Sequence, residues 1–185
     1  MFYLCSIGSN LDPHIHVRNV LEELLARFGP LQLSSVIRTK PVDMHSRHDF
    51  LNCLLVLESK LDAAALKQTF VALEIAQGRD RSDPHRKVRD RPLDIDILAS
   101  SPDGDFSTAQ VNPYLTELLT ELYRRGEVQD PKVELQVHLP RGTGKTLEQQ
   151  VGLVPTILGT MSERGQTTPP VHLDAGPRHV TVLHQ

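Results

Sequence analysis

The chain has no tryptophan, and only 4% of its 185 residues are aromatic. Sheets that bind single-stranded RNA depend on exposed aromatic side chains on which the bases stack. The formal net charge of −3 also argues against general nucleic-acid binding, because proteins that bind phosphate backbones usually carry a positive excess. We therefore expect no nucleic-acid partner.

Long hydrophobic runs are missing as well. No stretch approaches the roughly 20 apolar residues that a transmembrane helix needs, and the first apolar segment reaches a turn at Gly8 before a secretory signal could develop. The two cysteines, Cys5 and Cys53, lie in apolar runs and are expected to be buried free thiols. We expect a cytoplasmic protein with no membrane partner, and a monomer by default.

The remaining composition is that of an ordinary globular protein, with 39% hydrophobic and 23% charged residues. A chain of this length is expected to form one domain over residues 1–185. Its core is expected over residues 1–100, followed by a divergent part over 101–185. Residues 160–185 are rich in threonine, glycine and proline and are expected to be loosely ordered.

Hydrophobic periodicity predicts an α+β fold. Apolar alternation indicates strands, apolar residues at helical spacing indicate helices, and glycine or proline marks the ends of both. The order β-α-β-β-α-β is the ferredoxin-like arrangement, with two helices on one face of an antiparallel sheet and the other face left to carry function. Strands are expected at 2–7, 31–39, 50–58 and 92–98, helices at 13–28 and 63–77, and later elements at 114–125, 133–139 and 179–183.

Asp94 and Asp96 are the most informative residues of the chain. If Leu93 to Leu98 is a strand, the two carboxylates project from one face, with Cα atoms about 6.5–7 Å apart. Ionised carboxylates this close repel each other unless a cation lies between them. An isolated pair would be read as the acidic side of an exposed strand. Here an arginine-rich loop, residues 79–91, runs directly into the strand, which favours a site for divalent metal and a small phosphorylated ligand.

Several blocks of the sequence, taken together and in this order, resemble the 6-hydroxymethyl-7,8-dihydropterin pyrophosphokinase family of folate biosynthesis. The resemblance covers roughly residues 2–98. It implies a ferredoxin-like fold and an enzyme that transfers pyrophosphate from ATP to the pterin, giving the pterin diphosphate and AMP. The blocks are Ser6 to Leu11, Arg38 to Val42, Phe50 to Asn52, Glu74 with Gly78 to Arg81, and Arg91 to Leu98.

The resemblance implies a nucleotide side of the site, with ATP as co-substrate. Asp94 and Asp96 correspond to the pair that holds two Mg²⁺ ions between the nucleotide phosphates. Ile97 would flank the adenine. The implied phosphate-binding residues are Arg79, Arg81 and Arg91, and the implied catalytic set is Arg79, Arg91, Asp94 and Asp96.

A pterin side is implied as well. Thr39 and Val42 correspond to positions that line the heterocycle, and Phe50 to an aromatic that stacks on it. Asn52 corresponds to an asparagine whose amide reads a pterin donor–acceptor edge. Glu74 would support the site from the second helix. The loops 40–49 and 78–90 correspond to loops that close over the substrates and exclude water.

The chain departs from the family pattern at several places, of which two concern the proposed site directly. Arg89-Asp90 stands where a glycine-proline pair is common, and Val111 to Tyr114 lacks the usual histidine. Tyr114 and Tyr123 are the candidates for a second stacking aromatic. These departures leave one alternative open, a nucleotide- or pterin-binding paralogue without transfer activity or with altered specificity.

Two further motifs are weighed and set aside. The segment 141–146 looks like a phosphate-binding loop, but Leu139 stands where that motif needs its first glycine, so a surface turn is favoured. His45 and His48, flanked by two aspartates, could bind zinc. A solvated loop is the favoured interpretation of that segment.

Overall fold

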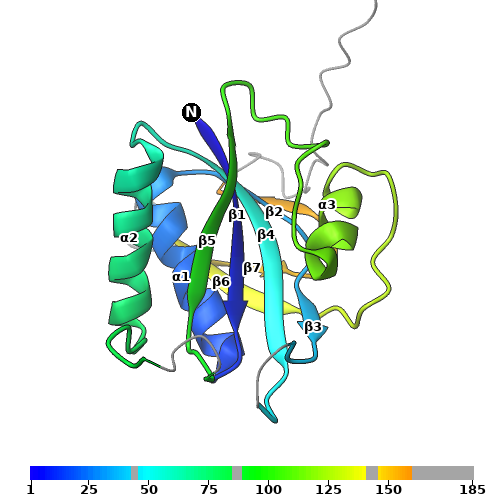
Figure 1. The fold of residues 1–185 in the computed structure, drawn as a ribbon. Helices are drawn as coiled ribbons and strands as arrows, with labels where there is room; N and C mark the ends of the chain where they lie inside the picture. Colours follow the sequence, from blue (N-terminus) through cyan, green and yellow to red (C-terminus); the bar gives the residue numbers. More distant parts are fainter. Residues whose placement is uncertain (43–45, 85–88, 141–145, 160–185) are drawn as a thin grey trace, which may run out of the picture.

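The structure is a computed structural model that describes residues 1–42, 46–84, 89–140 and 146–159 (Figure 1). The expected strand at 179–183 and the expected loose tail at 160–185 lie outside the described residues. The elements in chain order are β1 (Phe2–Ser9), α1 (Pro13–Phe28), β2 (Leu31–Leu33), β3 (Ile37–Thr39), β4 (Phe50–Glu58), α2 (Ala63–Ala76), β5 (Asp94–Ser101), the 3-10 turn η1 (Pro113–Leu115), α3 (Thr116–Leu122), β6 (Leu135–Pro140), β7 (Thr146–Val151) and β8 (Thr156–Leu158).

The main sheet is antiparallel and has the order β5-β1-β4-β2-β8, with β3 paired to β4 beyond the end of β2. The order β5-β1-β4-β2, with α1 and α2 as the connecting helices, is the ferredoxin-like arrangement. The predicted α+β class is thus confirmed. A separate hairpin is formed by β6 and β7, and β8 extends the main sheet at the β2 edge.

The two long helices begin and end where the sequence indicates, but only α2 has a side chain that caps its first turn. Asp62 accepts a hydrogen bond from the amide of Ala65 at 2.8 Å, which satisfies one free donor in the first turn of α2. Asp12 precedes Pro13 of α1 as expected, yet it adopts the left-handed conformation and makes no such bond. Gly29, with φ of 78°, ends α1 in a conformation that favours glycine.

The prediction of a single strand over 31–39 is wrong, because the chain leaves the sheet between β2 and β3. The hydroxyl of Ser34 accepts a hydrogen bond from the amide of Leu54 at 2.8 Å, in place of a backbone carbonyl. Val36 then turns away, and its amide donates to the carbonyl of Gly152 at 2.8 Å. The break therefore depends on a partner more than 100 positions away in the sequence.

One face of the sheet packs against the helices. Odd-numbered residues of β1 and β4, such as Cys5 and Cys53, face α1, α2 and the β6–β7 hairpin in the larger core cluster. Both cysteines are buried and free, as expected. None of the helices in the described ranges is long and apolar enough to cross a membrane.

The opposite face is not left open, contrary to expectation. Figure 1 shows α3 beside β4, away from α1 and α2. There η1 and α3 cover Leu4, Leu54 and Val56 with a second apolar cluster. The part of this face that remains for function is the end where β1 finishes and β5 begins.

Candidate active site

A pocket of about 210 Å³ lies at this end of the sheet. It joins both halves of the predicted site, because residues expected on the nucleotide side and on the pterin side line the same cavity. The predicted residues that line it are Thr39, Val42, Phe50, Asn52, Arg91, Asp94, Asp96 and Tyr114, and the others are Ser6, Ile7, Gly8 and Lys40.

Strand register explains why residues far apart in the sequence meet here. Gly8 of β1 pairs with Asn52 of β4 on one side and with Asp94 of β5 on the other, and Ser6 pairs with Asp96. Residues paired across an antiparallel sheet point to the same face. The two acids and the asparagine therefore lie on one surface, separated by the short side chains of β1.

Asp94 lies within a cluster of arginines. Nη1 of Arg91 donates to its Oδ2 at 2.6 Å, and Nη1 of Arg79 donates to its Oδ1. The side chain of Asp94 is 19% exposed, so this acid is largely shielded from solvent. Burial acts to raise the pKa of Asp94, but the hydrogen bonds and charges of Arg79 and Arg91 outweigh it and hold that pKa below its ordinary value.

Asp96 is more accessible, with 54% of its side chain exposed. Its Oδ1 accepts a hydrogen bond from Nζ of Lys67 at 2.8 Å. The motif around Asp96 does not indicate this lysine, which comes from α2. A signal was nevertheless present, because Lys67 and Glu74 are seven positions apart and so lie on the same face of a helix.

Glu74 is a fully buried carboxylate behind the acid pair. Its Oε1 accepts a hydrogen bond from the amide of Ile95 at 2.9 Å, and its Oε2 lies 3.1 Å from Arg79 and 3.3 Å from Arg81. Burial raises the pKa of Glu74 above its ordinary value, although the Ile95 amide and the two guanidinium groups oppose this shift. Arg79 and Arg81 thus lie behind Asp94 rather than along the pocket wall.

On the pterin side, the amide of Asn52 is held in one orientation. Its Nδ2 donates to Oγ1 of Thr39 at 2.8 Å, and the residue is 7% exposed. A Cβ atom on Gly8 would lie only 2.9 Å from Oδ1 of Asn52, so glycine is needed for this approach. The ring of Phe50 lies beside the guanidinium of Arg91, whose carbon is 5.9 Å from the ring centroid.

Two loops are joined next to the pocket residue Arg91 by a cluster of hydrogen bonds. We call this cluster the loop clasp, and its residues are Asn10, Ser46, His48 and Asp90. Nδ2 of Asn10 donates to Oδ1 of Asp90 at 2.7 Å and to Oγ of Ser46 at 3.2 Å. Nδ1 of His48 lies 2.8 Å from Oδ2 of Asp90. Oδ1 of Asn10 accepts from the amide of Arg91 at 2.7 Å. Asp90, one of the departures from the family pattern, therefore connects the segment before β4 to the segment before β5.

The remaining predicted residues fall away from the cavity or at its rim. Ile97 is partly buried and packs against the core on the helix face of the sheet. Val42 is 67% exposed and Tyr114 is 42% exposed, both at the rim. The hydroxyl of Tyr123 accepts from the amide of Phe106 at 2.8 Å. Tyr114, rather than Tyr123, is thus the aromatic placed to contact a ligand.

Within the described ranges, no group of three or more histidine, cysteine, aspartate or glutamate residues could hold a metal by itself. His45, one half of the zinc alternative, lies outside those ranges, as do residues 141–145 of the phosphate-loop alternative. Two carboxylates are nevertheless sufficient for Mg²⁺ that arrives with a nucleotide, because this ion usually keeps waters and takes further oxygens from substrate phosphates.

An acid pair with arginines beside an aromatic and amide pocket is the arrangement of a nucleotide-dependent transferase that acts on a flat heterocycle. The family model described as 7,8-dihydro-6-hydroxymethylpterin-pyrophosphokinase (HPPK) matches residues 4–141. This chain belongs to that family.

Relatives in two strains of Porphyromonas gingivalis are similar to this chain. Each is named 2-amino-4-hydroxy-6-hydroxymethyldihydropteridine pyrophosphokinase and is 39% identical over 98 residues. The match covers 52% of this chain and 67% of each relative.

Proposed function

We propose that this chain transfers the β,γ-diphosphate of ATP to the hydroxymethyl oxygen of 6-hydroxymethyl-7,8-dihydropterin, a step of folate biosynthesis. The hydroxyl loses its proton to solvent and its oxygen bonds to the β-phosphorus. The bond from that phosphorus to the bridging oxygen breaks, and AMP leaves with the bridging oxygen. Membership of the pyrophosphokinase family carries this proposal. The joining of the acid pair with Phe50 and Asn52 in one pocket supports it.

On the acceptor side, Asn52 offers its amide to the donor–acceptor edge of the pterin. The hydrogen bond to Thr39 fixes the rotamer of this amide before the ligand arrives, which lowers the entropy lost on binding. Phe50 stacks on the ring, and Val42 covers it from the rim. These contacts hold the hydroxymethyl group close to Asp94 and Asp96 and so supply the orientation on which this class of reaction depends.

On the nucleotide side, Asp94 and Asp96 would hold Mg²⁺, and two ions are proposed. When bound, the metal neutralises phosphate charge and lowers the pKa of the attacking hydroxyl. Arg91 reaches the pocket and can bind phosphate oxygens directly, whereas Arg79 and Arg81 keep the carboxylate cluster charged and act on phosphates from behind it. A contact of Ile97 with adenine stays a prediction.

The described residues offer no observation that favours the alternative of a binding paralogue. Tyr114 lies at the pocket rim although the usual histidine is missing nearby. We propose small-molecule substrates as the binding partners of this pocket. The single domain over 1–185, the monomeric state and the cytoplasmic location stay predictions.

The test is to mix the protein with ATP, MgCl₂ and the pterin and to follow the nucleotides by chromatography. We expect equal amounts of AMP and pterin diphosphate, and no product when EDTA removes the metal. Formation of ADP, or of AMP without pterin diphosphate, would contradict the proposed transfer. Nucleotide binding without pterin binding, measured by calorimetry with a non-hydrolysable ATP analogue, would favour the paralogue instead.

A further inference from the structure

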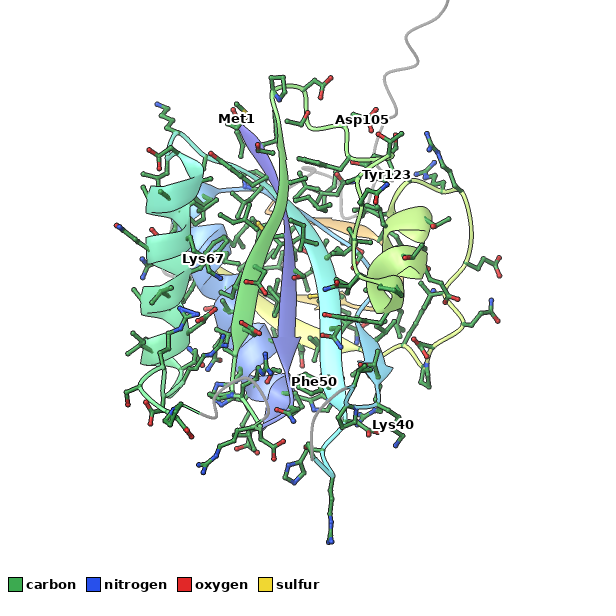
Figure 2. The ribbon with its side chains drawn as sticks, in the orientation of Figure 1. Met1, Lys40, Phe50, Lys67, Asp105 and Tyr123 are labelled. Carbon is green, nitrogen blue, oxygen red and sulfur yellow. The ribbon has the colours of Figure 1, made fainter. Side chains whose placement is uncertain are left out.

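Lys67 is the feature of this site that neither the acid pair nor the pterin pocket explains. It belongs to α2 and reaches toward β5, the edge strand of the sheet (Figure 2). Its Nζ donates to the carbonyl of Ile95 at 2.5 Å and to Oδ1 of Asp96 at 2.8 Å. The ammonium therefore lies at the outer edge of β5, where it contacts both the backbone of this strand and a carboxylate that lines the pocket.

The two acids are neutralised by cations of different kinds. Asp94 is held by two guanidinium groups, which stay charged and are fixed by several hydrogen bonds. Asp96 is held by an ammonium on a flexible stem whose side chain is 35% exposed. An ammonium has three donors, so Lys67 can leave Asp96 and still keep the Ile95 carbonyl and the charge of Glu74, 4.0 Å away.

We propose that Lys67 is a built-in counter-cation for the metal site. In the absence of metal it occupies Oδ1 of Asp96 and holds this side chain toward the pocket. When Mg²⁺ arrives with the nucleotide, the ion takes this oxygen and the ammonium withdraws to the Ile95 carbonyl. Lys67 is a positioning residue that weakens metal binding and so couples it to the arrival of phosphate.

The physical reason is competition between two cations for one oxygen. A divalent ion and an ammonium that share a carboxylate oxygen repel each other, so the metal must first displace the lysine. Phosphate oxygens reduce this repulsion between the metal and the ammonium, since they bring negative charge that both cations can share. This inference rests on the metal role proposed for Asp94 and Asp96.

A purely structural role for Lys67, fastening α2 to β5, predicts a different outcome. If Lys67 only holds α2 to β5, replacing it leaves metal affinity unchanged or lowers it, because Asp96 becomes less ordered. Loss of a competing cation raises metal affinity. The two interpretations therefore differ in the sign of one measurable quantity, which does not depend on turnover.

The experiment compares Lys67→Met with Lys60→Met. Lys60 is an exposed lysine just beyond the opposite end of β4, so this control removes the same charge far from the pocket. Mn²⁺ is titrated into each folded protein, first alone and then with a saturating non-hydrolysable ATP analogue. Bound metal is measured by electron paramagnetic resonance, and the Mn²⁺ that the analogue binds without protein is subtracted. We expect Lys67→Met to bind Mn²⁺ roughly fivefold more tightly than wild type, as loss of one partly exposed ion pair implies, and Lys60→Met to match wild type.

Lys67→Gln is the second variant, because it keeps a donor for the Ile95 carbonyl without the charge. It should also bind Mn²⁺ more tightly, and it replaces Lys67→Met if that variant does not fold. If wild type binds Mn²⁺ but a folded variant without the charge binds it equally or more weakly, the role of Lys67 alone is overturned. If neither wild type nor the variants bind Mn²⁺ with the analogue, the metal role of Asp94 and Asp96 is overturned as well.

Discussion

At the scale of single residues, Gly8 matters because it has no side chain and so leaves room for the amide of Asn52. We expect Gly8→Ala to displace the Asn52 amide, because the new Cβ would lie 2.9 Å from Oδ1 of Asn52. Asn52 has little freedom to yield while it is bonded to Thr39. Pterin affinity, measured by calorimetry with an ATP analogue, should fall at least about tenfold, in keeping with a lost buried hydrogen bond.

A double-mutant cycle separates this explanation from a general distortion of β1. If the alanine acts through Asn52, it should have little further effect on pterin affinity in the Asn52→Ala background. A full tenfold loss in both backgrounds would show that position 8 acts in some other way.

The two acids should behave differently when each is replaced by its uncharged isostere. Asp94→Asn and Asp96→Asn are both expected to lower AMP formation by at least about 100-fold, since metal and phosphate charge dominate such reactions. Their effects on stability should differ. Asp94→Asn removes a largely shielded charge from two arginines and should cost about 2–3 kcal/mol of unfolding free energy, whereas Asp96→Asn should cost less than about 1 kcal/mol.

Urea unfolding and AMP chromatography on the same preparations check both halves of this prediction. Equal stability losses for the two variants would contradict the difference in environment seen around Asp94 and Asp96. Appreciable activity in either variant would count against the metal role.

At the scale of elements, the loop clasp connects the segment before β4 to the segment before β5. We expect Asp90→Ala to release the amide of Arg91, which Asn10 holds at 2.7 Å, because Asn10 loses its partner in Asp90. Hydrogen exchange at Arg91 should speed up about tenfold or more, the usual sign of local opening. Asp49→Ala is the matched control, since Asp49 pairs with Lys40 on the first loop; equal exchange in the two variants would contradict the clasp.

The clasp should also depend on pH in a defined direction. Burial acts to raise the pKa of Asp90, but hydrogen bonds from Ser46, His48 and Asn10 hold it below its ordinary value. A carboxyl group with a lowered folded-state pKa stabilises the fold above its unfolded-state value and loses that contribution as the pH falls through the folded-state value. Urea unfolding of wild type and Asp90→Asn at a series of pH values should show a difference that disappears under acidic conditions; a difference that grows toward low pH would contradict this.

Some elements could be predicted from local sequence and others could not. The strands around Cys5 and Cys53 were predictable because short apolar runs that end at turn residues are a local signal, and the strand around Ile95 because apolar residues alternate with acids. Asp94 and Asp96 stood out because the arginine loop leads directly into them. The break between β2 and β3 was not predictable, because it depends on Gly152. Lys67 was missed because its partner, Asp96, is 29 positions away and on another element.

At the scale of the whole molecule, the two free thiols report on global unfolding. Burial raises the pKa of Cys53 to about 12 and raises the pKa of Cys5 further above its ordinary value. Both lie in the core cluster between sheet and helices, so the reactive thiolate forms only when the sheet separates from them. The folded protein should resist alkylation by iodoacetamide at pH 8 and react rapidly in urea at the unfolding midpoint; rapid labelling of the native protein would contradict the packing described.

The position of the acid pair on an outer strand has one more consequence. Strands at the border of a sheet expose backbone groups that can pair with another chain and lead to aggregation. At Ile95 both backbone groups are occupied by side chains of α2: Glu74 accepts from the amide and Lys67 donates to the carbonyl. The same helix that supports the carboxylates therefore seals this border against the addition of a foreign strand.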